Sequence, residues 1–242
     1  MFKRRFVVLG SKKFRHELKF YINQFEYESL RKKVKAVLRQ DKNSINENGY
    51  HIRSLYFDNL YNTDLYEKNY GILKRKKIRI RIYNKADSII KLERKYRYGE
   101  YICKESASIE KEEYEQILNY NYDFLLKKDK AIYKDFYLYL RSEKLSPKVI
   151  VDYVREAYVG EESDVRITFD KNLSVGMNSI DIFNENLVTI ESLQAPLLIM
   201  EVKFNEYLPT YIRKVLALDA HNRSAISKYV ICREGRIQFN KY

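Results

Sequence analysis

The residues best suited to chemistry in this chain are lysines and arginines that recur at every second position. Residues 77–82 read Lys-Ile-Arg-Ile-Arg-Ile, so three cations alternate with three isoleucines. Because a β-strand points successive side chains to opposite faces, this segment is predicted to be a strand with one cationic and one apolar face. Cations gathered on one face are suited to binding an anion such as a phosphate group.

The same division recurs along at least five other predicted strands. Each places charged or polar side chains on one face and apolar ones on the other. The polar faces carry Arg15, Glu17 and Lys19; Lys91, Glu93, Lys95 and Arg97; Tyr153 and Arg155; Arg166, Thr168 and Asp170; and Glu201 and Lys203.

One interpretation of this pattern is an antiparallel sheet with one face in water, which is common. Two observations favour another. Cations dominate these faces, whereas solvent faces usually mix Thr, Ser, Gln and Glu with Lys. Cations opposed across neighbouring strands also repel each other unless an anion offsets them. We therefore predict a barrel with a charged lumen and apolar outer walls covered by helices.

The acids on these faces have two possible roles. Glu17, Glu93, Asp170 and Glu201 could supply hard oxygen ligands for Mg²⁺ or Mn²⁺ bridging phosphate oxygens. Alternatively, they form structural salt bridges with neighbouring Lys and Arg. Glu201 is the best metal candidate, because the Glu-x-Lys pair with Lys203 would supply a ligand and a phosphate clamp together.

The composition limits the class of protein and of partner. The chain has 242 residues, of which 45% are hydrophobic, so one globular domain over residues 1–242 is expected. Its net charge of +13 implies an anionic partner: nucleic acid, a membrane surface or a phosphorylated small molecule. The 23 tyrosines would allow base stacking. Many of them lie at core-like positions, however, so specific nucleic-acid binding is not expected.

Neither cysteine nor histidine spacing indicates a metal or redox site. Cys103 and Cys232 lie in strand-like segments outside any CxxC pair, and we expect them to be buried free thiols in a reducing cytosol. No segment of about 18 apolar residues exists, and the apolar run at residues 6–9 is too short for a signal peptide. The protein is therefore expected to be soluble and cytoplasmic, unless a membrane partner recruits it.

Hydrophobic periodicity predicts an α+β fold of about eight largely antiparallel strands with helices outside. The predicted strands are 15–21, 51–58, 76–83, 89–97, 101–106, 148–158, 165–173, 187–192 and 197–204. The predicted helices are 24–39, 62–69, 110–118, 123–140 and 209–218. The lysines of helix 123–140 could dock a membrane or a polymer, but a solvated helix face is the favoured interpretation.

The sequence resembles a known family, the VTC domain of the vacuolar transporter chaperone-type polyphosphate polymerases. This family lies within the triphosphate tunnel, or CYTH-like, superfamily. The resemblance runs from Arg15 to about Arg233 and rests on the order and spacing of several short pieces. They are Arg-His-Glu-Leu-Lys-Phe at 15–20, Ser-Leu-Tyr-Phe-Asp-Asn at 54–59, Arg-Ile-Arg at 79–81, Leu-Glu-Arg-Lys at 92–95, Tyr-Val-Arg at 153–155, Val-Arg-Ile-Thr-Phe-Asp at 165–170, Glu-Val-Lys-Phe at 201–204 and Ser-Lys-Tyr at 227–229.

The resemblance implies an antiparallel tunnel barrel that moves the γ-phosphate of ATP onto inorganic polyphosphate with Mn²⁺ or Mg²⁺. Such a transfer depends on positioning and charge neutralisation, and its acceptor is already an anion. By position, Glu201 matches the metal-binding glutamate. The catalytic set is expected to be Lys19, Arg79, Arg81, Arg155, Arg166 and Lys228. The substrate-binding set is expected to be Lys68, Lys95, Lys104, Tyr153, Ser227 and Lys203.

The sequence departs from the family pattern at three positions. Lys68 stands where Arg is expected, and Ala225 where Lys is expected. Arg15 occupies the first acidic position of the superfamily's Glu-x-Glu-x-Lys signature, which disfavours the triphosphatase and cyclase members. Two rivals remain open: a tunnel hydrolase that cleaves triphosphate or polyphosphate, and a non-catalytic module that binds polyphosphate or nucleic acid.

Overall fold

The computed structural model describes residues 15–99 and 101–239, so the apolar run at residues 6–9 lies outside the described part. Its main element is an antiparallel sheet of ten strands. The strands are β1 (His16–Ile22), β2 (Arg39–Gln40), β3 (Tyr50–Asp58), β4 (Lys74–Tyr83), β5 (Ala86–Tyr98), β6 (Tyr101–Ser108), β7 (Ser146–Val159), β8 (Arg166–Gly176), β9 (Thr189–Glu191) and β10 (Leu198–Phe204). The helices are α1 (Gln24–Val37), α2 (Thr63–Asn69), α3 (Lys111–Leu118), α4 (Ala131–Ser142), α5 (Thr210–Leu216) and α6 (Lys228–Phe239), with short 3₁₀ turns η1 (Asp123–Lys127), η2 (Glu162–Asp164) and η3 (Leu218–Ala220).

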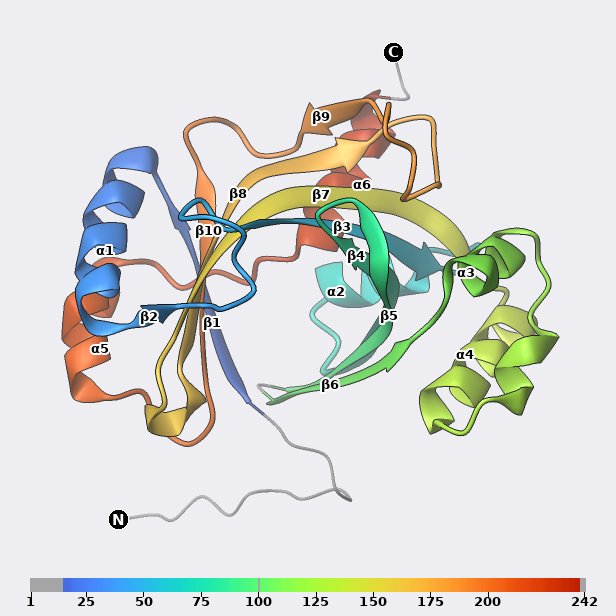
Figure 1. Cartoon of the computed structure of the whole chain (residues 1–242), viewed down its shortest axis with the longest axis horizontal. Helices are drawn as coiled ribbons and strands as arrows, with labels where there is room; N and C mark the ends of the chain where they lie inside the picture. Colours follow the sequence, from blue (N-terminus) through green and yellow to red (C-terminus); the bar gives the residue numbers. More distant parts are fainter. Residues whose placement is uncertain (1–14, 100, 240–242) are drawn as a thin grey trace.

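The sheet curls until its two edge strands approach each other at the lower side of Figure 1. The strand order is β1-β10-β8-β7-β3-β4-β5-β6, with β2 paired to β7 and β9 to β8. Just before β1, the N–H of Arg15 donates a 3.2 Å hydrogen bond to the carbonyl of Ile102 in β6. Register shifts after Tyr56, Arg81 and Asp152 mark bulges, which add twist and bending.

This arrangement confirms the predicted antiparallel tunnel fold. Two details differ from the prediction. The path from β1 to β6 has the expected eight strands, but the short strands β2 and β9 bring the sheet to ten. Among the described residues, the edges are joined by the Arg15–Ile102 bridge and not by a continuous ladder, so the barrel is not closed.

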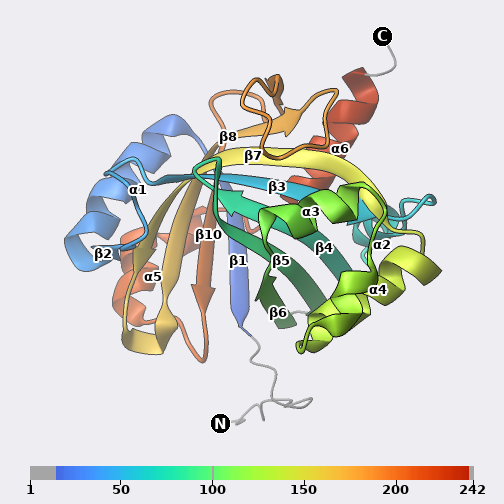
Figure 2. The same cartoon turned by 45° about the vertical axis from the view of Figure 1, so that its right-hand side comes forward.

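One outer wall of the curled sheet packs against α3 and α4 (Figure 2). The isoleucines of β4, Ile78, Ile80 and Ile82, join a buried cluster with Ile117 of α3 and Phe136 of α4. These are the apolar residues that alternate with the cations of the same strand, so the outer face carries the core that the sequence predicts. Burying them removes apolar area from water, which is the main source of stability for such a wall.

The opposite outer wall packs against α1 and α5 (Figure 1). The first turn of α1 is fixed by a capping box, in which the Asn23 side chain accepts from the Glu26 N–H and Glu26 accepts from the Asn23 N–H. This start orients Tyr27, Leu30 and Val34 towards the sheet at helical spacing. Both outer walls are thus covered by helices, as predicted.

Helix α6 lies on the other face, inside the curl. The ring centroid of Tyr229 lies 5.2 Å from that of Tyr56 of β3, with the rings tilted, and Val230 packs in one cluster with Val149 and Val151 of β7. Cys232, which was expected in a strand, is buried on this helix because it shares one side with Tyr229. Part of the inner face is therefore apolar and occupied by α6, which leaves the remainder for the charged residues.

Two predicted elements differ in extent. The helix expected over residues 123–140 breaks into η1 and α4, because Lys128 adopts an extended conformation within a run of charged residues that bury no side chain. The strand expected over 187–192 shortens to β9. Among the described helices, none combines the length and apolar character that crossing a bilayer requires.

The outer core generates a stability prediction. Ile80 is 0% exposed, whereas Ile89 on the neighbouring strand is 48% exposed. We expect Ile80→Ala to lower the free energy of unfolding by about 2–5 kcal/mol, because it leaves a cavity in the wall beneath α3 and α4. Ile89→Ala is the matched control and should change it by less than about 1 kcal/mol. Urea denaturation measures both, and equal losses would contradict the assignment of Ile80 to the core.

Candidate anion-binding tunnel

The inner face of the sheet collects cations from seven strands and from the first turn of α6. They are Lys19, Lys77, Arg79, Arg81, Lys95, Lys104, Arg155, Arg166, Lys203 and Lys228. Nine of them contact carboxylates within salt-bridge distance, while Lys77 contacts a hydroxyl. The carboxylates are Glu17, Asp41, Glu93, Asp170 and Glu201. We call this set of charged residues the tunnel cluster.

Glu201 of β10 lies at the centre of the largest group of ion pairs. Its carboxylate oxygens lie 2.6 Å from Lys228 Nζ and 2.9 Å from Lys203 Nζ. Lys19 Nζ is 3.3 Å away, and Arg155 Nη2 is 3.6 Å away. Burial alone would raise the pKa of Glu201, but the four surrounding cations outweigh burial and hold the pKa well below its usual range. Glu201 is therefore an ionised, hard oxygen donor.

Asp170 of β8 fixes the guanidinium of Arg155. Arg155 donates to both carboxylate oxygens, at 2.6 and 2.7 Å, which is the bidentate geometry that suits Arg. Lys228 Nζ lies 2.5 Å from the same carboxylate. Because Asp170 is fully buried, this pair holds Arg155 and Lys228 in place beside Glu201.

Glu93 of β5 organises a second group on the other side of the tunnel. It accepts from Arg79 at 2.6 Å and from Lys104 at 2.6 Å, with Arg81 3.8 Å away. Burial opposes ionisation, but these cations lower the pKa of Glu93 well below its usual range. The arginines also donate to tunnel hydroxyls: Arg79 to Tyr56 Oη at 2.7 Å, and Arg81 to Ser54 Oγ and Tyr153 Oη, both at 3.0 Å.

The segment before α6 brings backbone and hydroxyl groups to the tunnel. Lys77 Nζ donates to Ser227 Oγ at 2.9 Å, and Lys19 Nζ donates to the carbonyl of Ile226 at 3.1 Å. Burial lowers the pKa of Lys77 well below its usual value, and other lysines add to the effect. The Lys77 amine also lies over the Tyr229 ring, 4.5 Å from its centroid, and a part-buried lysine with no carboxylate of the described residues within salt-bridge distance gains from a nearby anion.

Two predicted residues lie at the periphery of the cluster. Lys68 on α2 is half-buried, and burial together with the charges of Arg75 and Arg97 lowers its pKa. Arg166 of β8 donates to Asp41 and, at 3.1 Å, to Tyr50 Oη. The other predicted site residues therefore lie together, while Lys68 and Arg166 lie at the margin of the tunnel cluster.

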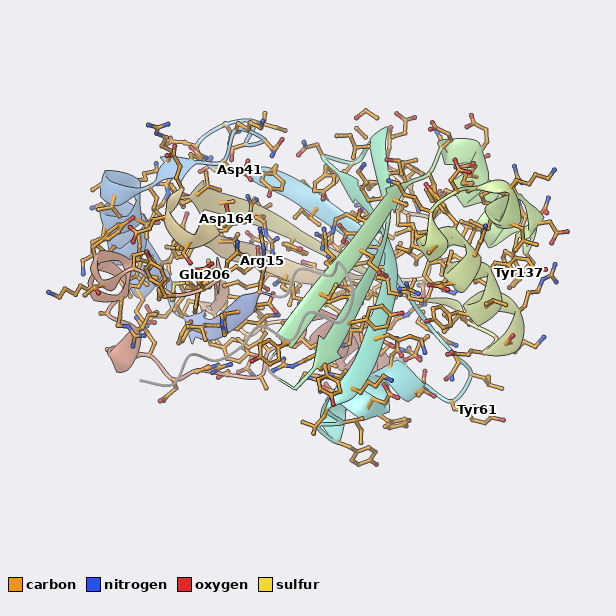
Figure 3. The ribbon with its side chains drawn as sticks, turned by 90° about the horizontal axis from the view of Figure 1, so that it is seen from below. Arg15, Asp41, Tyr61, Tyr137, Asp164 and Glu206 are labelled. Carbon is orange, nitrogen blue, oxygen red and sulfur yellow. The ribbon has the colours of Figure 1, made fainter. Side chains whose placement is uncertain are left out.

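The structure also shows where Arg15 lies, at the first position of the Glu-x-Glu-x-Lys signature. Arg15, which replaces the glutamate of the superfamily signature, lies beside Asp164 in Figure 3, and its Nη2 is 3.8 Å from the Asp164 carboxylate. Both side chains are largely exposed. Glu17, Glu93 and Asp170 all form ion pairs with Lys or Arg, as the salt-bridge interpretation predicts.

Some tunnel residues were not among the predicted site residues. Lys77 carries a signal in the sequence, because it is in phase with Arg79 and Arg81 on β4. Tyr56 likewise shares a face with Ser54 on β3. Asp41 comes from the loop after β2, and no periodic pattern marks its pairing with Arg166.

A divalent metal bound here would need phosphate oxygens and water as ligands in addition to protein groups. Within residues 15–99 and 101–239, no group of three or more His, Cys, Asp or Glu side chains is placed to hold a metal ion. Asp170 is already engaged by Arg155 and Lys228. Glu201 fits the role of a single protein ligand, because Mg²⁺ beside phosphates commonly takes one or two carboxylates and fills its other positions with phosphate oxygens and water.

Comparison with known proteins agrees with this geometry. The sequence model of the VTC domain matches residues 14–235. The resemblance inferred from the short pieces is therefore confirmed over nearly the whole chain. No curated protein matches the sequence.

Two solved structures share the fold. A Bacillus halodurans protein provisionally described as an adenylate cyclase is 12% identical, with a TM-score of 0.54 over 90% of this chain and 96% of its own. A Vibrio parahaemolyticus protein with the same provisional description is 14% identical, with a TM-score of 0.50 over 90% of this chain and 97% of its own. At such low identity these similarities establish the tunnel fold and nothing about activity.

The site predicts a specific pH dependence. Burial lowers the pKa of Lys95 to about 8, with Glu17 opposing the shift and Lys19 adding to it. As the pH rises from 7 to 9, Lys95 loses its proton, so we expect the affinity for tripolyphosphate to fall several-fold. Lys95→Arg stays charged and should flatten this fall, as measured by titration calorimetry at constant ionic strength. Identical profiles for the two proteins would contradict the assignment, because changes in the ligand's own ionisation affect both equally.

Proposed function

The chain belongs to the VTC domain family, and from that premise we propose that it is a polyphosphate polymerase. In this proposal it transfers the γ-phosphate of ATP onto a growing chain of inorganic polyphosphate inside the tunnel. ATP and polyphosphate are then its partners. We place the reaction in the cytoplasm, with recruitment by a membrane partner as a further prediction.

The observation that carries the proposal is the charge surplus of the tunnel cluster. Among the described residues of this cluster, ten lysines and arginines face five carboxylates, so basic groups outnumber acids by five in a confined space. Like charges held this close repel strongly where little water screens them. A triphosphate or polyphosphate carries several negative charges along one line, and it would offset that surplus along the strands.

The chemistry of the donors supports phosphoryl transfer in particular. Arg79, Arg81 and Arg155 offer planar forks that match phosphate oxygens, while the lysines offer mobile point charges. Their positions are fixed in advance by Glu93 and Asp170, so little reorganisation would be needed as charge develops on the transferred group. The acceptor is a terminal phosphate, which needs no strong base.

Glu201 is our proposed ligand for Mn²⁺ or Mg²⁺. Bound there, the ion would neutralise charge on the phosphates and help to align them. The amine of Lys203, which now contacts Glu201, would then turn to the phosphate oxygens, while Arg155 and Lys228 would stay positioned by Asp170.

The tyrosines of the tunnel favour phosphate over nucleic acid. Tyr56, Tyr153 and Tyr229 are buried, and the hydroxyls of the first two accept from Arg79 and Arg81. Base stacking needs an exposed ring beside the cations, which these three do not present. A phosphate chain needs only the charges and hydroxyls that line the tunnel.

The central test is incubation of the protein with ATP and Mn²⁺. We expect long-chain polyphosphate, visible on a gel, and ADP in equal amount to the phosphate incorporated. Glu201→Gln should abolish synthesis when it is assayed under conditions in which circular dichroism shows the variant to be folded. Release of free phosphate without polymer would support the tunnel hydrolase instead, and unchanged turnover in Glu201→Gln would refute the metal assignment.

A second test compares two arginines on neighbouring strands of one sheet, each paired with glutamate. Arg79 faces the tunnel, whereas Arg94 lies on the outer face with Glu105 and Asp135. We expect Arg79→Lys to weaken nucleotide binding about tenfold or more, because the fork geometry is lost. Arg94→Lys is the matched control and should leave binding unchanged. Calorimetric titration with a non-hydrolysable ATP analogue measures both, and equal effects would place the binding site elsewhere.

A further inference from the structure

Glu17 is held differently from the other tunnel carboxylates. Among the described residues, its ion-pair partners are all lysines: Lys95 at 2.8 Å, Lys203 at 3.6 Å and Lys19 at 3.9 Å. Its side-chain hydrogen bonds within that part of the chain come from Lys95. Asp170 and Glu93, by contrast, each hold an arginine through two short bonds.

The position of Glu17 makes it a link across the gap between the sheet edges. Glu17 lies on the edge strand β1, and its nearest partner Lys95 lies on β5, beside the opposite edge strand β6. Strands β1 and β5 do not pair with each other. Glu17 therefore draws together amines from β1, β5 and β10 that would otherwise repel each other, at the place where no ladder joins the walls.

The type of partner decides what can happen when an anion enters. A lysine amine sits on a flexible stem with three rotatable donors, so it can leave a carboxylate and turn to a phosphate at little cost. Arginines held by two bonds to buried Asp170 or Glu93 cannot move so freely. The lysines around Glu17 are thus the exchangeable part of the tunnel cluster, and Glu17 is the charge with which a phosphate must compete.

We propose that Glu17 is a positioning residue that acts as an internal counter-ion. It holds Lys95, and it shares Lys19 and Lys203 with Glu201, which lies nearer to both. It thereby limits how tightly these three amines can bind a phosphate chain, so that the chain can advance. A path that conducts a charged species must bind it well enough to admit it and weakly enough to release it. This inference rests on the proposed function for the identity of the chain that moves, but its binding step can be tested without turnover.

The test is calorimetric titration of the full chain with tripolyphosphate. Glu17→Gln keeps the size of the side chain and removes its charge, so we expect binding about tenfold tighter or more, and slower release of bound polyphosphate. Combining Glu17→Gln with Lys95→Gln removes one charge of each sign, and it should return the affinity close to that of the unaltered protein. The matched control is Glu143→Gln, which removes a carboxylate that pairs with Lys76 and lies outside the tunnel cluster, and it should have no effect.

The outcomes separate this inference from the proposed function. If the unaltered protein binds tripolyphosphate and Glu17→Gln binds it equally or more weakly, Glu17 is only a structural salt bridge and the inference is overturned. If the unaltered protein does not bind tripolyphosphate at all, the proposed function fails first. If Glu17→Gln unfolds without anion, tripolyphosphate must refold it at concentrations below those that protect the unaltered protein, and failure to do so also overturns the inference.

Discussion

Repulsion between cations confined inside a curled sheet is the constraint on which this structure depends. The tunnel cluster gathers nine described lysines and arginines of the inner face with Lys228 of α6, and they can be held together only because buried carboxylates lie among them. Removing one such acid would leave its partners buried and unpaired, which is far more costly than losing a surface ion pair. The acids therefore do not weaken the case for an anion site. They are the condition that lets the protein fold before the anion arrives.

The rest of the fold serves to keep that charged interior in place. The outer walls are apolar and covered by α1 and α5 on one side and by α3 and α4 on the other, so each strand is anchored by its outward side chains. Helix α6 fills the apolar part of the inner face and delivers Lys228 to Glu201 and Asp170. On the proposed function, a phosphate chain is thereby confined to the part of the tunnel that α6 leaves open.

The inner face was predictable from sequence because alternation over one strand is a local property. Residues 77–82 show it by themselves, and the same rule assigned Glu201 and Lys203 to the tunnel. What the sequence could not indicate is pairing across distance. Asp41 reaches Arg166 from a loop, and Glu17 meets Lys95 across the gap between the sheet edges. Helix α6 was missed for a related reason: a short apolar run fits a strand or a helix, and only its packing on β7 and β8 decides.

The two kinds of carboxylate contact divide the tunnel into a fixed and an adjustable part. Arg79 and Arg155 are locked by two-bond contacts, and such rigid forks suit the step in which a phosphoryl group must be aligned. Lys19, Lys95 and Lys203 have flexible stems, and several of their carboxylate contacts are 3.3–3.9 Å long, so these contacts exchange more readily. A polymerase needs both properties, since it must hold the reacting phosphate still and yet let the product chain move on.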